Sequence, residues 1–411
     1  MTTNLKNLYG SQYAEQGERY QQIRKGFEET FGNSEGADFY SAPGRTEIGG
    51  NHTDHNHGRV LAASIDLDIV GMARKTDNGV AKLRSLEYPR MDEVDLSDLN
   101  ARQEQSGSQA IIRGICARCK ELGYNIGGFE CYTQTRVLKG SGLSSSAAFE
   151  ILVVTVVSHL YNDGNIDPIT AAKIAQYAEN VYFGKPSGLL DQMASSMGSV
   201  TAMDFADPEK PQVENVSFDL NAYKHAMCVV DTGGNHADLT ADYASIPQEM
   251  KDVAKFFGKE FLREVDEAEF YDRLGEVRKA VGDRPALRAM HFFDDDRLAH
   301  EEAQALRDRD FDRFLTMVRA SGKSSVQRLQ NVFAPASPIE QGITLALAVA
   351  ERLLNDRGAC RVHGGGFAGT IQAYVPFDIL DSFRAGMEKV FGEGSCYVLS
   401  VRGCGGVKVE E

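Results

Sequence analysis

The feature that most constrains the fold is a strand, a glycine-rich loop and a helix that follow one another in residues 129–161. Residues 129–137 have the pattern of a strand, residues 139–143 contain two glycines, and residues 144–161 have the pattern of a helix. The longest apolar run of the chain, residues 151–157, lies inside that helix and is too short to span a bilayer. We therefore expect a globular protein of mixed α and β structure without a transmembrane segment.

Hydrophobic spacing predicts further elements on both sides of this unit. Apolar residues recur at helical spacing in residues 20–31, ahead of Gly32, which predicts an amphipathic helix near the N-terminus. In residues 65–69 apolar residues alternate with Asp66 and Asp68, which predicts a strand with one solvated face. The remaining predicted elements are helices at residues 108–122, 168–183 and 247–257, several helices between residues 298 and 354, and strands at residues 227–231 and 362–374.

The length of the chain predicts two domains. Its 411 residues exceed the roughly 250–300 residues at which a single hydrophobic core stops growing, so two domains of comparable size are expected. No repeat, low-complexity tract or proline-rich linker marks a boundary. We place it near Ala206, where the motifs of the first half end, and so divide the chain into residues 1–205 and 206–411. A binding cleft between the two domains is then expected.

Charge and cysteine content exclude several classes of partner. A formal net charge of −15 at pH 7 argues against nucleic-acid and membrane partners, because both require concentrated basic surface. The N-terminal segment is polar and carries Glu15 and Glu18 where a secretory peptide is apolar. Seven cysteines, an odd number, do not resemble a disulfide framework in a chain this long. We expect a cytoplasmic protein whose partners are small molecules.

Residues 140–148 read GSGLSSSAA and combine small residues with hydroxyl groups at the start of the predicted helix. Backbone N–H groups at a helix start carry partial positive charge, and glycines let the backbone approach an anion closely. One serine would suffice to cap the helix, whereas three consecutive serines follow the Gly-x-Gly sequence. We interpret the segment as a phosphate-binding loop. Its assigned residues are Gly140, Ser141, Gly142, Leu143, Ser144, Ser145 and Ser146.

Residues 44–56 read GRTEIGGNHTDHN and place a guanidinium, carboxylates, imidazoles and amides in a turn with several glycines. Sugar hydroxyls both donate and accept hydrogen bonds, so Asn51, His52 and Asp54 can bind several of them at once. Arg45, which is permanently charged, can instead face a phosphate group. We interpret this segment as a polyol-binding turn.

A third segment, Gly364-Gly365-Gly366, opens a sequence that formally fits the dinucleotide-binding pattern G-x-G-x-x-G. That pattern must open a helix, whereas residues 370–375 have the pattern of a strand. We therefore expect a tight glycine loop that lets another segment of the chain approach closely.

Taken in order, the three segments resemble the signature motifs of the GHMP kinase superfamily, and the segment GRTEIGGNHTDHN is similar to the galactokinase signature. The resemblance extends over most of the chain. It implies an α+β fold with an N-terminal domain of the ribosomal-protein-S5 type, a C-terminal ferredoxin-like domain and an active site between them. It also implies the transfer of phosphate from ATP, with Mg²⁺ as cofactor, to the anomeric C1 hydroxyl of galactose.

The resemblance assigns roles to single residues. Residues 188–192, which read GLLDQ, resemble the family segment in which Asp191 would be the base that accepts the proton of the sugar hydroxyl. Arg45 would face Asp191 and the transferring phosphoryl group, and Ser146 and Glu179 match the family's Mg²⁺ ligands. Phosphoryl transfer needs mainly alignment and neutralisation of charge, which agrees with these roles. The residues assigned to the sugar are Asn51, His52, Asp54, Gly188 and Tyr243.

One departure from the family pattern affects the substrate. Asn51 stands where galactokinases usually carry a glutamate that contacts the C6 hydroxyl, and an uncharged amide would tolerate a C6 carboxylate. Galacturonate is therefore the alternative substrate. A non-catalytic sugar sensor and a mevalonate or homoserine kinase are alternatives of other kinds. The presence of Asp191 and Arg45 favours a catalyst, and the polar turn of residues 44–56 favours a sugar.

Overall fold

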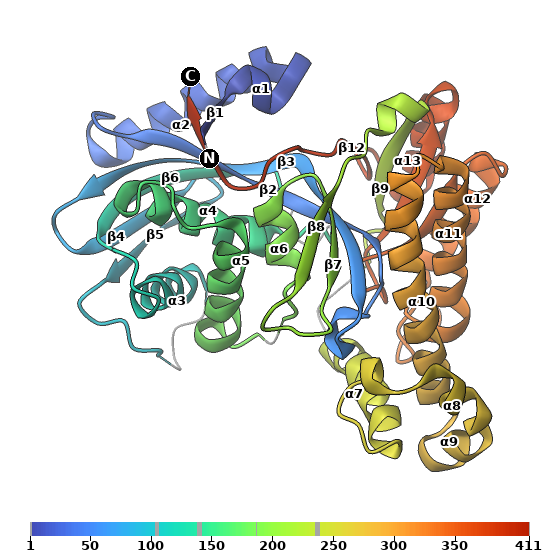
Figure 1. Cartoon of the computed structure of the whole chain (residues 1–411). Helices are drawn as coiled ribbons and strands as arrows, with labels where there is room; N and C mark the ends of the chain where they lie inside the picture. The colour runs from blue at the N-terminus through green and yellow to red at the C-terminus, as the bar shows by residue number, and fades with distance from the viewer. Residues whose placement is uncertain (1, 103–106, 138–141, 186, 235–238, 411) are drawn as a thin grey trace.

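The computed structural model describes residues 2–102, 107–137, 142–185, 187–234 and 239–410, and these residues contain two sheets (Figure 1). The larger sheet has nine strands in the order β1-β13-β2-β3-β6-β4-β5, with β7 attached to β3 and β8 to β7. Its strands are β1 (Thr2–Asn4), β2 (Asp38–Gly49), β3 (Arg59–Thr76), β4 (Val80–Ser85), β5 (Tyr88–Asp95), β6 (Gly128–Thr135), β7 (Val200–Asp204), β8 (Gln212–Val216) and β13 (Val407–Glu410).

Helices cover both faces of the larger sheet (Figure 1). On one face lies α2, whose apolar stripe of Tyr20, Ile23 and Phe27 is fully buried and which ends at Gly32, as the sequence predicts. On the other face lies α4, whose apolar run is buried because it packs against β2 and β3 on one side and α5 and α6 on the other. The helices of this region are α1 (Leu5–Tyr9), α2 (Tyr13–Phe31), α3 (Ser108–Glu121), α4 (Ser145–Tyr161), α5 (Pro168–Tyr177) and α6 (Leu190–Met197).

The smaller sheet has four antiparallel strands in the order β10-β11-β9-β12. Alternate residues of its strands contribute to a separate apolar cluster with α12 and α13, while α11 packs against β10. Its elements are β9 (His225–Asp231), β10 (Ala359–His363), β11 (Thr370–Pro376), β12 (Cys396–Leu399), α10 (Asp283–Arg307), α11 (Phe311–Ser324), α12 (Gly342–Leu354) and α13 (Leu380–Phe391). The mixed α and β class that the sequence predicts is therefore confirmed.

A third apolar cluster joins α7 (Thr240–Phe256), α8 (Glu267–Asp272) and α9 (Leu274–Val281) to the N-terminal half of α10. These helices lie at the lower end of the molecule in Figure 1, beyond the tip of the β2–β3 hairpin. The predicted helix at residues 247–257 begins earlier than expected, at Thr240, and includes Pro247 in its interior. Among the described residues, none of the helices has the length and apolar character needed to cross a bilayer.

The prediction of a solvated face for residues 65–69 is wrong at Asp68. This side chain is completely buried and accepts hydrogen bonds from Arg19 (2.6 Å), Arg402 (3.0 Å) and the hydroxyls of Ser41 and Tyr9. Arg19 comes from α2 and Arg402 from the segment before β13, so both cations reach Asp68 only in the tertiary structure. The carboxylate thus joins the two ends of the chain to the larger sheet.

The two sheets bear on how the chain divides into domains. The boundary placed near Ala206 falls between β7 and β8, and both of these strands belong to the larger sheet. The C-terminal strand β13 also returns to that sheet, where it pairs with β1 and β2. A division at residues 205 and 206 stays a proposal, and any domain built on the larger sheet includes strands from both halves of the sequence.

Candidate active site

Arg45 and Asp191 form an ion pair where β2, the described part of the serine loop and α6 meet. The pairing of β2 with β3 is irregular between Pro43 and Arg45, and such irregularities can re-aim a side chain. Arg45 Nε donates to Asp191 Oδ1 at 2.7 Å, and its Nη1 donates to the carbonyl of Gly142 at 2.5 Å. The other oxygen of Asp191 accepts from Ser144 Oγ at 2.5 Å. Three of the segments singled out in the sequence therefore meet at one carboxylate.

The Asp191 carboxylate is held in its ionised form. Partial removal from water opposes ionisation, but the Arg45 guanidinium and the hydrogen bonds from Arg45 and Ser144 outweigh it and lower the pKa of Asp191 below its usual range. The side chain of Asp191 stays 33% exposed, whereas that of Arg45 is 9% exposed. A ligand can therefore reach the carboxylate from one side while the guanidinium supports it from the other.

The serine loop prepares the start of α4 for an anion. Ser144 precedes the helix in a left-handed conformation (φ 53°), and its hydroxyl points to Asp191 instead of capping the helix. Among the described residues, no side chain caps the first turn, so its backbone N–H groups stay available to a ligand. Ser145 lies in that turn, and Ser146 follows with an exposed side chain. Gly140 and Ser141 lie outside the described residues.

The turn after β2 brings His52 and Asp54 to the same region. Burial lowers the pKa of His52 to about 3, so the ring is neutral, and its Nε2 donates to the carbonyl of Gly365 at 3.0 Å. Nδ1 is then an acceptor. Gly188 lies so close to Asp54 that an added Cβ would come within 2.1 Å of its Oδ2. The absence of a side chain at position 188 thus allows Asp54 to approach the segment that bears Asp191.

Asn51, by contrast, faces protein groups. Its residue exposure is 0%, and its side-chain amide donates to Glu47 Oε1 at 2.9 Å and to the carbonyl of Gly364 at 2.7 Å. Its side-chain oxygen accepts from Asn331 Nδ2 at 2.9 Å. No polar atom of the Asn51 side chain is left to bind a ligand, which is not the arrangement expected for a sugar contact.

The third motif forms the tight loop that the sequence predicts, between β10 and β11. Tyr243 of α7 donates to the carbonyl of Gly366 at 3.0 Å, and a Cβ at Gly365 would lie 2.4 Å from its ring. A cavity of about 210 Å³ opens beside this contact. It is lined by Gly142, Tyr243, His363, Thr370 and residues of the 365–369 loop. Gly142 and Tyr243, assigned to ATP and to sugar, therefore border one cavity.

Glu179 belongs to a carboxylate cluster beside Asp191. It lies in a π-helical turn, Ala178–Phe183, that continues α5. Gln192, the residue after Asp191, donates from its amide nitrogen to Glu150 Oε2 (3.0 Å) and to Glu179 Oε2 (2.8 Å). Burial and the neighbouring Glu179 raise the pKa of Glu150, which is one turn beyond Ser146 on α4. The cluster thus brings the helix of Ser146 close to Glu179.

Lys185 occupies the open side of Glu179. Its ammonium lies 2.8 Å from Glu179 Oε1, and its side chain is 56% exposed. Hydroxyl and carboxylate oxygens are the ligands that Mg²⁺ prefers, and the ammonium shows that this position accepts a cation. Among the described residues there is no group of three or more His, Cys, Asp or Glu side chains arranged to hold a metal ion. A Mg²⁺ ion here would therefore need oxygens from a bound phosphate, as is common for this ion.

Sequence reasoning missed several residues of the site. Gln192, Glu150 and Lys185 contribute through the carboxylate cluster, and Asn331 and His363 contribute through their contacts with the first and third motifs. Gln192 and Lys185 lie within a few residues of Asp191, so their closeness in sequence to the predicted base could have identified them as residues of the site. Asn331 lies in no motif, and no feature of the sequence indicates its role.

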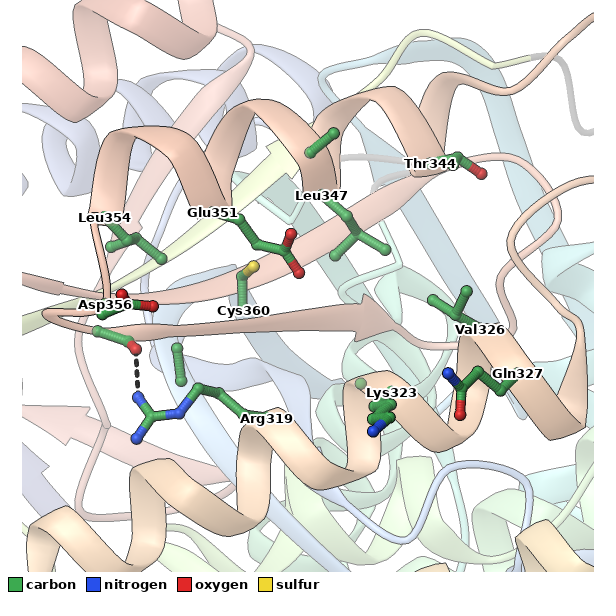
Figure 2. Close-up of a pocket in the computed structure, with 14 residues that line it drawn as sticks. Arg319, Lys323, Val326, Gln327, Thr344, Leu347, Glu351, Leu354, Asp356 and Cys360 are labelled. Carbon is green, nitrogen blue, oxygen red and sulfur yellow. Dashed lines mark hydrogen bonds between the residues drawn. The ribbon is translucent and has the colours of Figure 1, made fainter.

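A larger cavity lies elsewhere. Figure 2 shows this groove of about 500 Å³ between α11 and α12, with Cys360 of β10 in its floor. Arg319 lies along α11 and donates to the carbonyl of Gly358, and Glu351 extends from α12. None of the residues assigned to sugar, ATP or metal lines this groove. The candidate active site is therefore the smaller cavity and the ion pair near it.

Known families match both halves of the site. Residues 25–75 match the family described as "Galactokinase galactose-binding signature", and residues 110–199 match "GHMP kinases N terminal domain". A galactokinase of Actinobacillus pleuropneumoniae serotype 3 is 28% identical over 364 residues, which cover 87% of this chain and 90% of that protein. A galactokinase of Streptomyces coelicolor is 28% identical over 369 residues, which cover 89% of this chain and 91% of that protein.

Solved structures agree with these matches. The crystal structure of Lactococcus lactis galactokinase complexed with galactose has a TM-score of 0.81 and 26% sequence identity, and the alignment covers 95% of this chain and all of that chain. A crystal structure of mevalonate kinase has a TM-score of 0.63 at 13% identity and covers 89% of this chain and 99% of that chain. At that identity it shows a shared fold only. The two-domain α+β fold expected from the sequence is therefore confirmed.

Proposed function

We propose that this chain, a sugar kinase of the galactokinase family within the GHMP kinase superfamily, phosphorylates galactose at the anomeric hydroxyl. The sugar O–H bond breaks, and its proton passes to Asp191. A bond forms between the C1 oxygen and the γ-phosphorus of ATP, the bond from that phosphorus to the β,γ-bridging oxygen breaks, and ADP leaves with that oxygen. The products are galactose 1-phosphate and ADP. The observation that carries the proposal is the Arg45–Asp191 ion pair, open to ligand on one side and joined to the serine loop through Ser144.

In this mechanism Asp191 accepts the proton of the C1 hydroxyl. Its lowered pKa keeps it ionised at neutral pH and makes it a weak base, so its largest contribution is to orient the hydroxyl for attack. Arg45 keeps the carboxylate in place and adds positive charge near the transferring phosphoryl group. The backbone N–H groups at the start of α4 bind the phosphates of ATP.

The carboxylate cluster supports a Mg²⁺ site. Glu179 and the hydroxyl of Ser146 would hold the ion, which when bound neutralises charge on the phosphate oxygens. Lys185 now balances the charge of Glu179 and would share or give up that contact when a divalent cation binds. Gln192 holds Glu179 in position from the other side.

Galactose is the proposed sugar because both the family match and the galactose-bound relative concern that sugar. The galacturonate alternative assumed that Asn51 faces C6, and a fully buried Asn51 gives that assumption no support. His52 and Asp54 are the proposed contacts for sugar hydroxyls, with Gly188 and Tyr243 shaping the space around them. The seven cysteines are free thiols, which fits the proposed cytoplasmic location.

The test is ADP release by the purified chain with galactose, galacturonate, glucose and mevalonate, each with Mg²⁺ and with EDTA. We expect turnover with galactose that EDTA abolishes. Turnover with another of these substrates alone would replace galactose in the proposal. Binding of galactose without ADP release from any substrate would instead favour a sensor.

A further inference from the structure

We infer that Asn51 is a positioning residue that fixes the sugar-binding turn to the glycine loop of residues 364–369, and that it does not contact the sugar. The inference rests on the proposed function for the identity of the substrate. It assigns to Asn51 a role different from that of a sugar ligand, and it adds Asn331, which lies in no motif, as a second positioning residue.

Every polar group of Asn51 is hydrogen-bonded within the protein. Besides the three side-chain bonds already described, its backbone N–H donates to Asp295 Oδ2 at 2.6 Å, and its backbone carbonyl accepts from His291 Nε2 at 2.8 Å. His291 and Asp295 are one turn apart on α10. Asn51 therefore connects four segments: β2 and the turn after it, helix α10, the segment that carries Asn331, and the glycine loop. These contacts are named the Asn51 network below.

The chemistry of the network requires an amide at position 51. Glu47 Oε1 and the carbonyl of Gly364 can only accept, so the two hydrogens of the Asn51 Nδ2 group must face them. Asn331 donates to the remaining oxygen. A carboxylate at position 51 would place negative charge against Glu47, which is itself paired with the buried Arg361. Aspartate is therefore a poorer replacement than alanine, although it has nearly the same shape.

The network controls the groups on either side of it. His52 follows Asn51 in a left-handed conformation (φ 60°), which is costly for a residue with a Cβ and persists only where the surroundings enforce it. Its ring bonds to Gly365, next to the Gly364 carbonyl that Asn51 binds. The side-chain Nδ2 of Asn331 also donates to the carbonyl of Gly365 at 3.3 Å, and its backbone carbonyl accepts from the backbone N–H of Phe367 at 2.5 Å. The positions of His52 and of the glycine loop thus depend on the same two amides.

A positioning role and a ligand role give opposite results when substrates lose single hydroxyls. If Asn51 only positions the turn, Asn51→Ala lowers kcat/KM for galactose, and the same change made in His52→Ala, where the contact of His52 is already lost, alters kcat/KM by the same factor for galactose and for its 2-, 3-, 4- and 6-deoxy forms. We expect a loss of about 10–100-fold, because misplacing a binding group by about 1 Å can cost on the order of 100-fold. If Asn51 binds one hydroxyl, the variant loses much less with the sugar that lacks it. A difference of about fivefold or more for one deoxy sugar in the His52→Ala background would overturn the inference.

Further variants test whether Asn51 and Asn331 act in one network. Asn331→Ala should reproduce the loss seen with Asn51→Ala, and the double variant should lose less than the product of the two, because both residues act in one network. Asn51→Asp should lower kcat/KM more than Asn51→Ala does. Asn221→Ala, at an exposed asparagine outside the site, is the matched control and should lose nothing. A double variant whose loss in kcat/KM equals the product of the two single losses would contradict the shared network.

Hydrogen exchange provides a readout that does not depend on the identity of the sugar. Both variants keep the backbone carbonyl that accepts from the Phe367 amide, so exchange of this amide reports how firmly the side chains of Asn51 and Asn331 hold the loop. The Phe367 amide and its neighbours should exchange faster in Asn51→Ala and Asn331→Ala than in the wild type and the Asn221→Ala control. Unchanged exchange in a folded Asn51→Ala protein would refute the positioning role. If the wild type phosphorylates no sugar, the proposed function fails, and the exchange experiment still decides the role of Asn51.

Discussion

Asp68 and Asp191 are both held ionised by buried arginines, and they differ in how much of the carboxylate the protein occupies. Asp68 is 0% exposed and accepts from Arg19, Arg402, Ser41 and Tyr9. Asp191 is 33% exposed and accepts from Arg45 and Ser144. In both cases removal from water opposes ionisation, and neighbouring arginines outweigh it and lower the pKa.

The difference in exposure between the two carboxylates shows how an aspartate–arginine pair can serve either stability or catalysis. A carboxylate surrounded by donors has no lone pair left for a ligand, so Asp68 can only join α2 and the C-terminal segment to the sheet. Asp191 has fewer donors, and the side facing solvent is left for a substrate hydroxyl. The number of donors around the carboxylate, and not the charge pair, separates the two roles.

The largest expected effect is on turnover at Asp191. Asp191→Asn keeps an acceptor for Arg45 but removes the base and the negative charge, so kcat should fall by about 10²–10⁴-fold. The midpoint of thermal unfolding should change little, because the side chain is partly exposed. Steady-state kinetics and calorimetry on the same preparation check both statements. Full activity in this variant would remove Asp191 from the mechanism.

The opposite pattern is expected at Asp68. Asp68→Ala leaves two buried arginines without their carboxylate, which should lower the free energy of unfolding by about 3–5 kcal/mol. The folded fraction should keep a kcat close to that of the wild type. Urea unfolding and kinetics at low temperature test this. A large fall in kcat with unchanged stability would mean that the two aspartates do not divide the roles as described.

A smaller effect is expected at Ser144, the second donor to Asp191. Ser144→Ala removes a hydrogen bond to a charged group that is partly exposed, so kcat should fall by about tenfold. Ser145→Ala, in the same loop but with no hydrogen bond to Asp191, is the matched control. Equal losses in the two variants would indicate that the loop acts through the phosphates and not through Asp191.

The smallest effect concerns acid stability. The pKa of Asp68 is lower in the folded protein than in the unfolded chain, so its contribution to stability is complete above about pH 5, about one unit above the unfolded-state pKa, and is lost as the pH falls through the folded-state pKa. The difference in thermal midpoint between wild type and Asp68→Asn should therefore narrow between pH 5 and pH 3. A difference that stays constant over this range would show that Asp68 does not titrate with unfolding.

Local patterns predicted much of the fold. The helices at residues 20–31 and 144–161 and the glycine loop at 364–366 follow from hydrophobic spacing and turn chemistry, which act between residues close in sequence. The start of α7 at Thr240 was not predicted, because Pro247 resembles a helix start and only packing against α10 keeps it in a helix interior. Asp68 was expected in solvent because the alternation of apolar and polar residues shows on which face of the sheet a side chain lies. It does not show which other segments cover that face.

The candidate site divides in the same way. Sequence alone determined the kinds of group that are present: a serine loop at a helix start, a polar turn, and an aspartate and arginine suited to phosphoryl transfer. Only the tertiary structure decided which of these groups remain open to a ligand. Asn51 and Asp191 were both assigned to the substrate, yet Asn51 is enclosed by partners as distant in sequence as Asn331 and Gly364, whereas Asp191 keeps one side free. The chemistry of a residue is a property of its own side chain, but its access to a ligand depends on neighbours that only folding brings together.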